Sequence, residues 1–116
     1  MNRSVNGFHD SHIGILHHPN KPESLALSHE IEAFLHQNNH TKTWQESAWA
    51  VDESDYKLPT DVSLLITLGG DGTLLRAARL GAALGIPMLG VKMGRLGFLA
   101  EILPEDWQRP LLSVLN

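Results

Sequence analysis

The apolar residues of this chain follow two patterns, short continuous runs and helically spaced positions. Continuous runs at 13–16, 62–68 and 88–93 predict strands, because a parallel strand covered on both faces is apolar at nearly every position. Between Pro22 and Gln37, by contrast, the apolar residues recur at helical spacing. This spacing predicts an amphipathic helix whose buried side carries Leu27, Ile31, Phe34 and Leu35.

The rest of the chain completes an alternation of strands and helices. A second helix is predicted over 73–84, where Gly85 provides a C-terminal stop. Residues 41–51 are ambiguous and are compatible with an edge strand, and a short helix is expected after Pro104, with Pro110 near its first turn or at a break. This order predicts an α/β fold with a mostly parallel sheet and flanking helices.

Composition favours one small globular domain. The 116 residues are 42% hydrophobic and 19% charged, which suits a single buried core and argues against disorder. No apolar stretch approaches the roughly 20 residues of a membrane span, and the polar N-terminus is unlike a signal peptide. The sequence contains no cysteine, so disulfides and thiolate chemistry are excluded. We therefore expect a cytoplasmic protein with no membrane partner.

Charge is distributed unevenly along the chain. Residues 1–61 contain four Lys/Arg and nine Asp/Glu, a net charge of −5, whereas residues 62–116 contain five and four, a net charge of +1. Between Gly69 and Ala100 the only acidic residue is Asp71. A glycine-rich, cationic half suits a small anionic ligand, whereas nucleic acid is excluded as a partner because the overall balance is not strongly basic.

A glycine turn links the strand at 62–68 to the next helix and contains Asp71. Backbone N–H groups of such a turn, together with the start of a helix, are suited to binding phosphate oxygens. A carboxylate there would repel phosphate unless it holds a metal ion or accepts a proton from an attacking hydroxyl. Both interpretations indicate phosphoryl transfer. The alternative is that Asp71 only caps the helix.

Two common phosphate motifs do not fit this turn. A P-loop needs Gly-Lys-Ser or Gly-Lys-Thr after its glycines, and this chain has neither. A dinucleotide fingerprint starting at Gly70 would place Leu75 at its third glycine position and Asp71 against the pyrophosphate.

The flanking residues add a family resemblance. Gly69–Thr73 resembles the glycine–aspartate signature of NAD kinases, which diacylglycerol kinases, sphingosine kinases and phosphofructokinases share in looser form. Leu89–Glu101 is similar to a second NAD kinase signature, which lipid kinases lack. The resemblance extends from Ile13 to the end of the chain. Lys92 departs from it, because the family usually has Asn there.

The resemblance implies a reaction and a set of site residues. ATP or polyphosphate would donate a phosphoryl group to the 2′-hydroxyl of the adenosine ribose of NAD, giving NADP, with a divalent metal such as Mg²⁺. Asp71 would be the catalytic proton acceptor, and no residue of this chain is assigned as a metal ligand. Arg76 matches a position that can contact ligand, although a solvated helix cation is an equal alternative. The expected nucleotide-binding residues are Gly69, Gly70, Asp71, Gly72, Thr73 and Arg76.

The resemblance also implies the domain organisation. Residues 1–116 resemble the phosphofructokinase-like N-terminal domain of NAD kinases, and the family continues into an all-β domain that completes the nucleotide site. We therefore expect this chain alone to be inactive and the full-length form to be a homo-oligomer. Apolar surface near Trp107 and Leu111–Leu115 is expected to be exposed and available to that domain. The alternative functions are a non-catalytic nucleotide-binding or regulatory module and a relative of diacylglycerol or sphingosine kinases.

The histidines and tryptophans add no further site. All seven histidines lie at or before His40, without the carboxylate or cysteine partners at set spacing that metal sites use. The tryptophans are predicted to pack in the core or between domains.

Overall fold

The computed structural model describes residues 12–18, 20–40, 42–48, 61–93 and 103–115. In chain order the elements are β1 (His12–His17), α1 (Pro22–Gln37), β2 (Thr43–Ser47), β3 (Val62–Gly69), α2 (Asp71–Leu84), β4 (Met88–Lys92), the 3₁₀ turn η2 (Pro104–Asp106) and α3 (Gln108–Leu115). The predicted strands and helices are confirmed, including the ambiguous strand at 43–47, apart from the position at which α2 begins. The connection at 52–60 and the second glycine loop at 94–99 lie outside the described residues.

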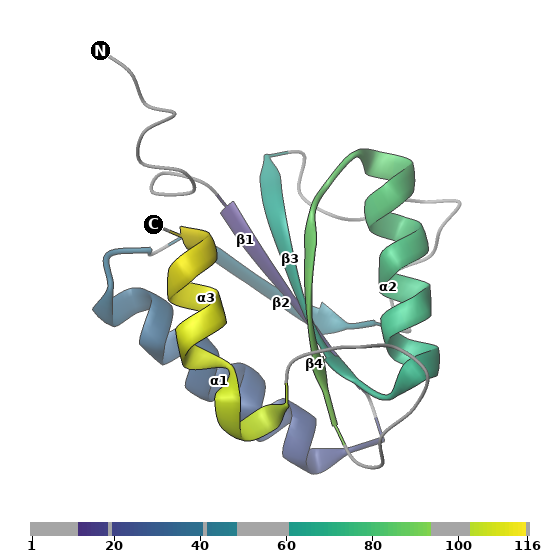
Figure 1. Cartoon of the computed structure of the whole chain (residues 1–116), viewed down its shortest axis with the longest axis horizontal. Helices are drawn as coiled ribbons and strands as arrows, with labels where there is room; N and C mark the ends of the chain where they lie inside the picture. Colours follow the sequence, from purple (N-terminus) through teal and green to yellow (C-terminus); the bar gives the residue numbers. More distant parts are fainter. Residues whose placement is uncertain (1–11, 19, 41, 49–60, 94–102, 116) are drawn as a thin grey trace.

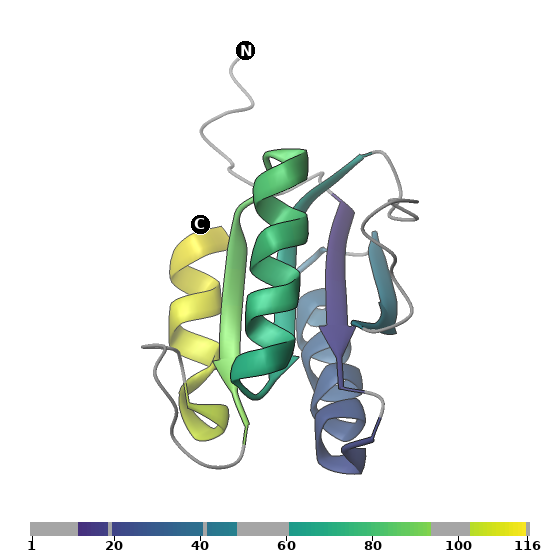
Figure 2. The same cartoon turned by 90° about the vertical axis from the view of Figure 1, so that its right-hand side faces the viewer.

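The four strands form one parallel sheet in the order β2-β1-β3-β4. Helices α1 and α3 cover one face of the sheet and α2 covers the other (Figures 1 and 2). The predicted α/β class is therefore confirmed. Helix α1 leads from β1 outwards to β2, and α2 leads from β3 outwards to β4 in the opposite direction. The winding of the chain thus reverses between β1 and β3.

Each face of the sheet has its own apolar cluster. The cluster on the α1 side includes Ile15, Ile66 and Val91, and the cluster on the α2 side includes Leu65 and Leu80. This division follows from strand geometry, because successive side chains of a strand point to opposite faces. β3 is buried at nearly every position because both of its faces are covered.

Two expectations about the helices are corrected. Helix α2 begins at Asp71 and not at Thr73, because Gly70 has the extended backbone of the N-cap residue. Trp107 is only 5% exposed, and Leu111 and Leu115 are buried as well. The expected exposure was wrong at these three residues, because α3 folds back over the sheet beside α1, whereas Val114 on the same helix is 38% exposed. Trp107 packs edge to face against Phe34 in α1, with 5.0 Å between ring centroids.

The end of α2 depends on small residues. Gly85 has a φ of 71° and forms the predicted C-terminal stop, and Ile86 N donates to the Gly81 carbonyl at 2.8 Å. A Cβ atom at Gly81 would lie 2.8 Å from the Ile86 carbonyl oxygen, a backbone atom that cannot turn away. A glycine at this position is therefore required by the tight return of the chain into β4.

We predict that Gly81→Ala destabilises the protein by ~1–3 kcal/mol, the usual cost of forcing extra atoms into packed structure. The matched control is Gly72→Ala in the first turn of the same helix, where no described atom lies within 4 Å of the new Cβ. This control should lose no stability. Urea denaturation of both variants measures the difference, and equal stabilities would contradict the prediction.

Candidate active site

All four strands end at the same edge of the sheet, because they are parallel. At this edge β1 ends at His17, β3 at Gly69 and β4 at Lys92. Open α/β sheets bind ligands outside the carboxyl ends of their strands, where the winding reverses. The reversal between β1 and β3 therefore places the predicted glycine turn at the expected position for a ligand.

The turn from β3 to α2 is tight. A Cβ atom at Gly69 would lie 2.7 Å from the Thr73 Cβ, so Gly69 is required for the first turn of α2 to pack on the end of β3. A Cβ atom added at Gly70 or Gly72 would have no described atom within 4 Å. The role of these two glycines is therefore not packing, and it fits a backbone that approaches a ligand closely.

Asp71 is the first residue of α2 and is not the helix cap. Gly70 is the N-cap residue, and no side chain forms a capping hydrogen bond there. The sequence-based alternative, in which Asp71 only caps the helix, is therefore wrong in its geometry. The first N–H groups of a helix have no partner within the helix, and its dipole favours negative charge at this end.

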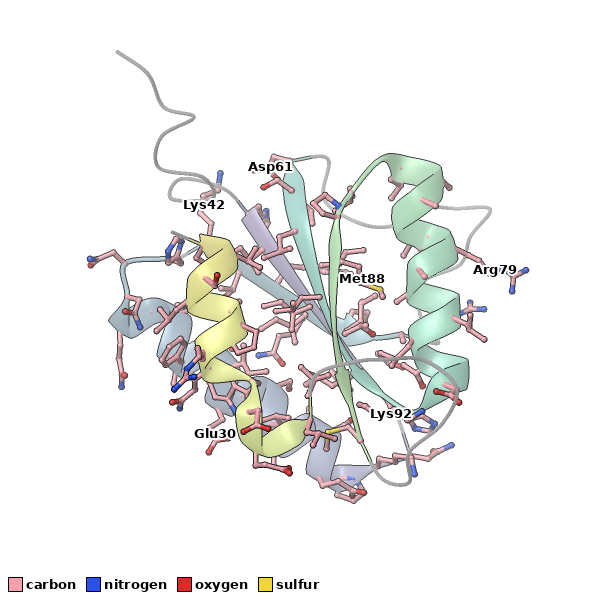
Figure 3. All side chains as sticks on the ribbon, viewed as in Figure 1. Glu30, Lys42, Asp61, Arg79, Met88 and Lys92 are labelled. Atoms are coloured by element: carbon pink, nitrogen blue, oxygen red, sulfur yellow. The ribbon has the colours of Figure 1, made fainter. Side chains whose placement is uncertain are left out.

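Asp71 forms an ion pair with Lys92. The Lys92 ammonium donates a hydrogen bond to Asp71 Oδ1. Gly69 and Lys92 are paired in register between β3 and β4, and Figure 3 shows Lys92 at the end of β4 near the start of α2. The Lys92 side chain is only 3% exposed, whereas that of Asp71 is 26% exposed. The pair therefore joins a buried cation to a carboxylate that reaches the surface.

Burial makes this pair energetically important. An isolated ammonium loses most of its hydration when it is buried, and this loss is tolerated only where an opposite charge and hydrogen bonds compensate it. Asp71 compensates the charge of Lys92. The two signature segments of the sequence are thus held together by a charge contact and not only by the sheet.

The two remaining predicted site residues, Thr73 and Arg76, also lie on α2. Thr73 is buried in the first turn of α2, next to the glycines. Arg76 lies one turn further along, and its Nε donates to the Ala48 carbonyl at 2.9 Å, which ties α2 to the chain at the end of β2. The predicted site residues did not include Lys92, although the sequence marked Lys92 as a departure from the family pattern. A charged residue inside the apolar run at 88–93 was the available signal.

His17 lies at the same edge, at the end of β1. Burial lowers its pKa, and the nearby His29 acts in the same direction, while a backbone hydrogen bond at His18 and the charge of Glu46 oppose the change. Its imidazole therefore loses its proton more readily than an exposed histidine does.

No group of three or more His, Asp or Glu side chains that could hold a metal ion occurs within the described residues. At the carboxyl edge, Asp71 is paired with an ammonium, which is a poor setting for a cation. The described residues thus do not fit a protein-held metal. Among the residues that the structure describes, no helix is long and apolar enough to cross a membrane.

Comparison with known proteins is consistent with this geometry. Residues 40–116 match the family model for the ATP-NAD kinase N-terminal domain. The chain is similar to an NAD kinase of Dehalococcoides mccartyi, with 39% identity over 103 residues, which cover 89% of this chain and 36% of that protein. It is also similar to an NAD kinase of Treponema denticola, with 39% identity over 83% of this chain and 33% of the relative. An NAD kinase of Nitrosococcus oceani is 52% identical over 60 residues, 52% of this chain and 20% of the relative.

We predict an asymmetric response of stability to loss of either partner of the pair. Asp71→Asn leaves the buried Lys92 ammonium uncompensated and should cost about 3 kcal/mol or more. Lys92→Met keeps the length of the side chain and leaves a carboxylate that water and the helix start can stabilise, so it should cost less. The double variant removes both charges and should regain most of the stability lost in Asp71→Asn.

Urea denaturation with linear extrapolation measures these differences. The matched control is the pair formed by Lys42 and Asp61, which is exposed and lies at the opposite edge of the sheet. Its neutralisation should change stability only slightly, since exposed ion pairs contribute little. Additive losses at Asp71 and Lys92 would show that the buried contact does not govern stability.

Proposed function

The chain belongs to the NAD kinase family, and on that basis we propose that it provides the glycine–aspartate part of an NAD kinase site. The reaction would transfer a phosphoryl group from ATP or polyphosphate to the 2′-hydroxyl of the adenosine ribose of NAD, giving NADP. The chain spans about a third of the length of the curated relatives it matches, 36% in the case of the Dehalococcoides protein. We propose that the remaining part of a full-length protein completes the site.

The observation that supports this function best is the position of Asp71. Its carboxylate lies at the start of α2, at the carboxyl edge of the sheet. The glycines on both sides of it leave room for a ligand, since no described atom lies within 4 Å of a Cβ placed at Gly70 or Gly72. A residue there can touch both a phosphate held by the helix start and a hydroxyl beside it. This is the arrangement that a general base for phosphoryl transfer needs.

In the proposed step, the 2′-oxygen of NAD attacks the terminal phosphorus of the donor. The new O–P bond forms while the bond to the leaving oxygen breaks, and ADP or a shortened polyphosphate departs. Asp71 accepts the hydroxyl proton as the O–P bond forms, since a ribose hydroxyl is barely acidic before that point. Backbone N–H groups of the turn at 69–73 would bind phosphate oxygens. Arg76 would support the ligand from α2 in addition to its bond to Ala48.

The divalent metal is not assigned to this chain. Mg²⁺ commonly binds through substrate phosphates and only one or two carboxylates. Since the described residues do not fit a metal site, we propose that any metal arrives with the donor, and we derive no step through it. A cytoplasmic location and a homo-oligomeric full-length form also remain proposals, based on the sequence alone.

A non-catalytic nucleotide-binding module is the alternative. In such a module, the pair formed by Asp71 and Lys92 would serve stability only. Replacing the two residues singly and together separates the two functions, because it distinguishes the loss of a base from the loss of a fold.

We predict that this segment supports catalysis when it replaces the matching N-terminal segment of the Dehalococcoides mccartyi NAD kinase. In this chimera, Asp71→Asn should reduce NADP formation by ~10²–10⁴, the usual effect of losing a positioned general base. NAD binding, measured by calorimetry, should change only slightly, since Asn has the same size and still forms hydrogen bonds.

The control is the double variant, in which both charges of the pair are removed. Asp71→Asn combined with Lys92→Met should recover most of the stability that Asp71→Asn loses but should not recover the turnover. Recovery of turnover in the double variant would show that Asp71 is not the base. A chimera that folds and binds NAD but forms no NADP would support the non-catalytic module.

We further predict that the 116-residue chain alone forms no measurable NADP from NAD and ATP. Phosphoryl transfer depends on positioning the donor and the acceptor together, and the described residues provide only one side of such a site. A coupled NADP assay on purified protein that is free of the host's own NAD kinase tests this. Robust turnover that disappears in Asp71→Asn would overturn the prediction.

A further inference from the structure

We propose that Lys92 is a positioning residue, which holds Asp71 and neutralises its charge so that an anionic phosphate can approach the carboxylate. This inference rests on the proposed function and adds a second residue to it. Lys92 acts through Asp71 and not through direct contact with the ligand, since its side chain is only 3% exposed.

Strand geometry explains why the lysine reaches Asp71. In β4, Val91 and the following Met93 belong to the cluster on the α1 side, whereas Met88 packs on the α2 side. Alternation therefore places Lys92 on the α2 side. Lys92 is also in register with Gly69, two residues before α2 begins. A long side chain at this position consequently ends at the first turn of α2, where Asp71 lies.

The electrostatic argument begins with the carboxylate. A base for phosphoryl transfer must lie close to a phosphate that carries the same sign of charge, and the two groups repel each other across a few ångströms. The Lys92 ammonium gives the pair no net charge, while the helix start adds a partial positive charge. The phosphate then meets a site that is neutral to slightly positive. A lysine from a neighbouring strand thus compensates for the acidic residue in the glycine turn.

A purely structural role makes a different prediction. If Lys92 only filled space and fastened β4 to α2, its loss would loosen the site whatever the charge of residue 71. If Lys92 neutralises Asp71, removing Lys92 should weaken phosphate binding only while the Asp71 carboxylate is present. The comparison of single and double variants therefore separates charge from packing.

The test is a titration of the intact 116-residue chain with inorganic pyrophosphate, followed by ¹H–¹⁵N NMR at the amides of 69–73. Lys92→Met should weaken pyrophosphate binding about tenfold, since one uncompensated charge at contact distance is worth a factor of that order. Lys92→Arg should retain binding, because it keeps the charge. Asp71→Asn combined with Lys92→Met should restore affinity to near that of the unmodified chain.

The control pair is again Lys42 and Asp61, which Figure 3 shows at the other edge of the sheet from Lys92. Lys42→Met should leave pyrophosphate binding unchanged. Equal weakening in Lys92→Met and the double variant, or no binding by the unmodified chain, would overturn the inference. Each result is independent of turnover in the chimera, so the inference can fail while the proposed function stands, and the reverse also holds.

Discussion

The burial of one ammonium group constrains the whole carboxyl edge of this sheet. Lys92 lies in a strand whose other residues are apolar or glycine, and almost none of its side chain meets water. A charge in that position needs a partner, and Asp71 is the partner that the described residues provide. The position of α2, the direction of the Asp71 carboxylate and the end of β4 therefore depend on each other.

The source of the cation distinguishes this site from a P-loop. A P-loop carries its lysine directly after its glycines, within the phosphate-binding turn itself. Here the turn carries a carboxylate, and the cation comes from β4, 21 residues further along the chain. The parallel pairing of β3 with β4 makes this possible, since it places Gly69 beside Lys92. The result is a turn that can offer both phosphate-binding N–H groups and a proton acceptor.

The topology determines where this chemistry lies. Because α1 and α2 lead away from each other on opposite faces, the winding reverses at the carboxyl ends of β1 and β3, which is where open α/β sheets bind ligands. Arg76 and its bond to Ala48 fasten the same edge from the side of β2. This bond and the ion pair between Lys92 and Asp71 tie the turn at 69–73 to the neighbouring strands, which helps to position a phosphate and a hydroxyl.

The sequence by itself determined the elements and the motif. Apolar runs long enough for buried strands and one clear helical stripe predicted the α/β class, because burial on one or both faces imposes those periods. The glycines around Asp71 predicted the turn, and the resemblance of Gly69–Thr73 and Leu89–Glu101 to NAD kinase signatures supplied the predicted chemistry. The edge strand at 43–47 was ambiguous because a strand at the border of a sheet has less apolar surface to reveal it.

Only the tertiary structure decided which side chains meet. It showed that Trp107 is buried against Phe34, because helix α3 folds back over the sheet in a way that local periodicity does not encode. It also showed that Lys92 is paired with Asp71. That contact depends on strand order, register and the face to which a residue points, and these are set by the packing of the whole chain and not by any local segment.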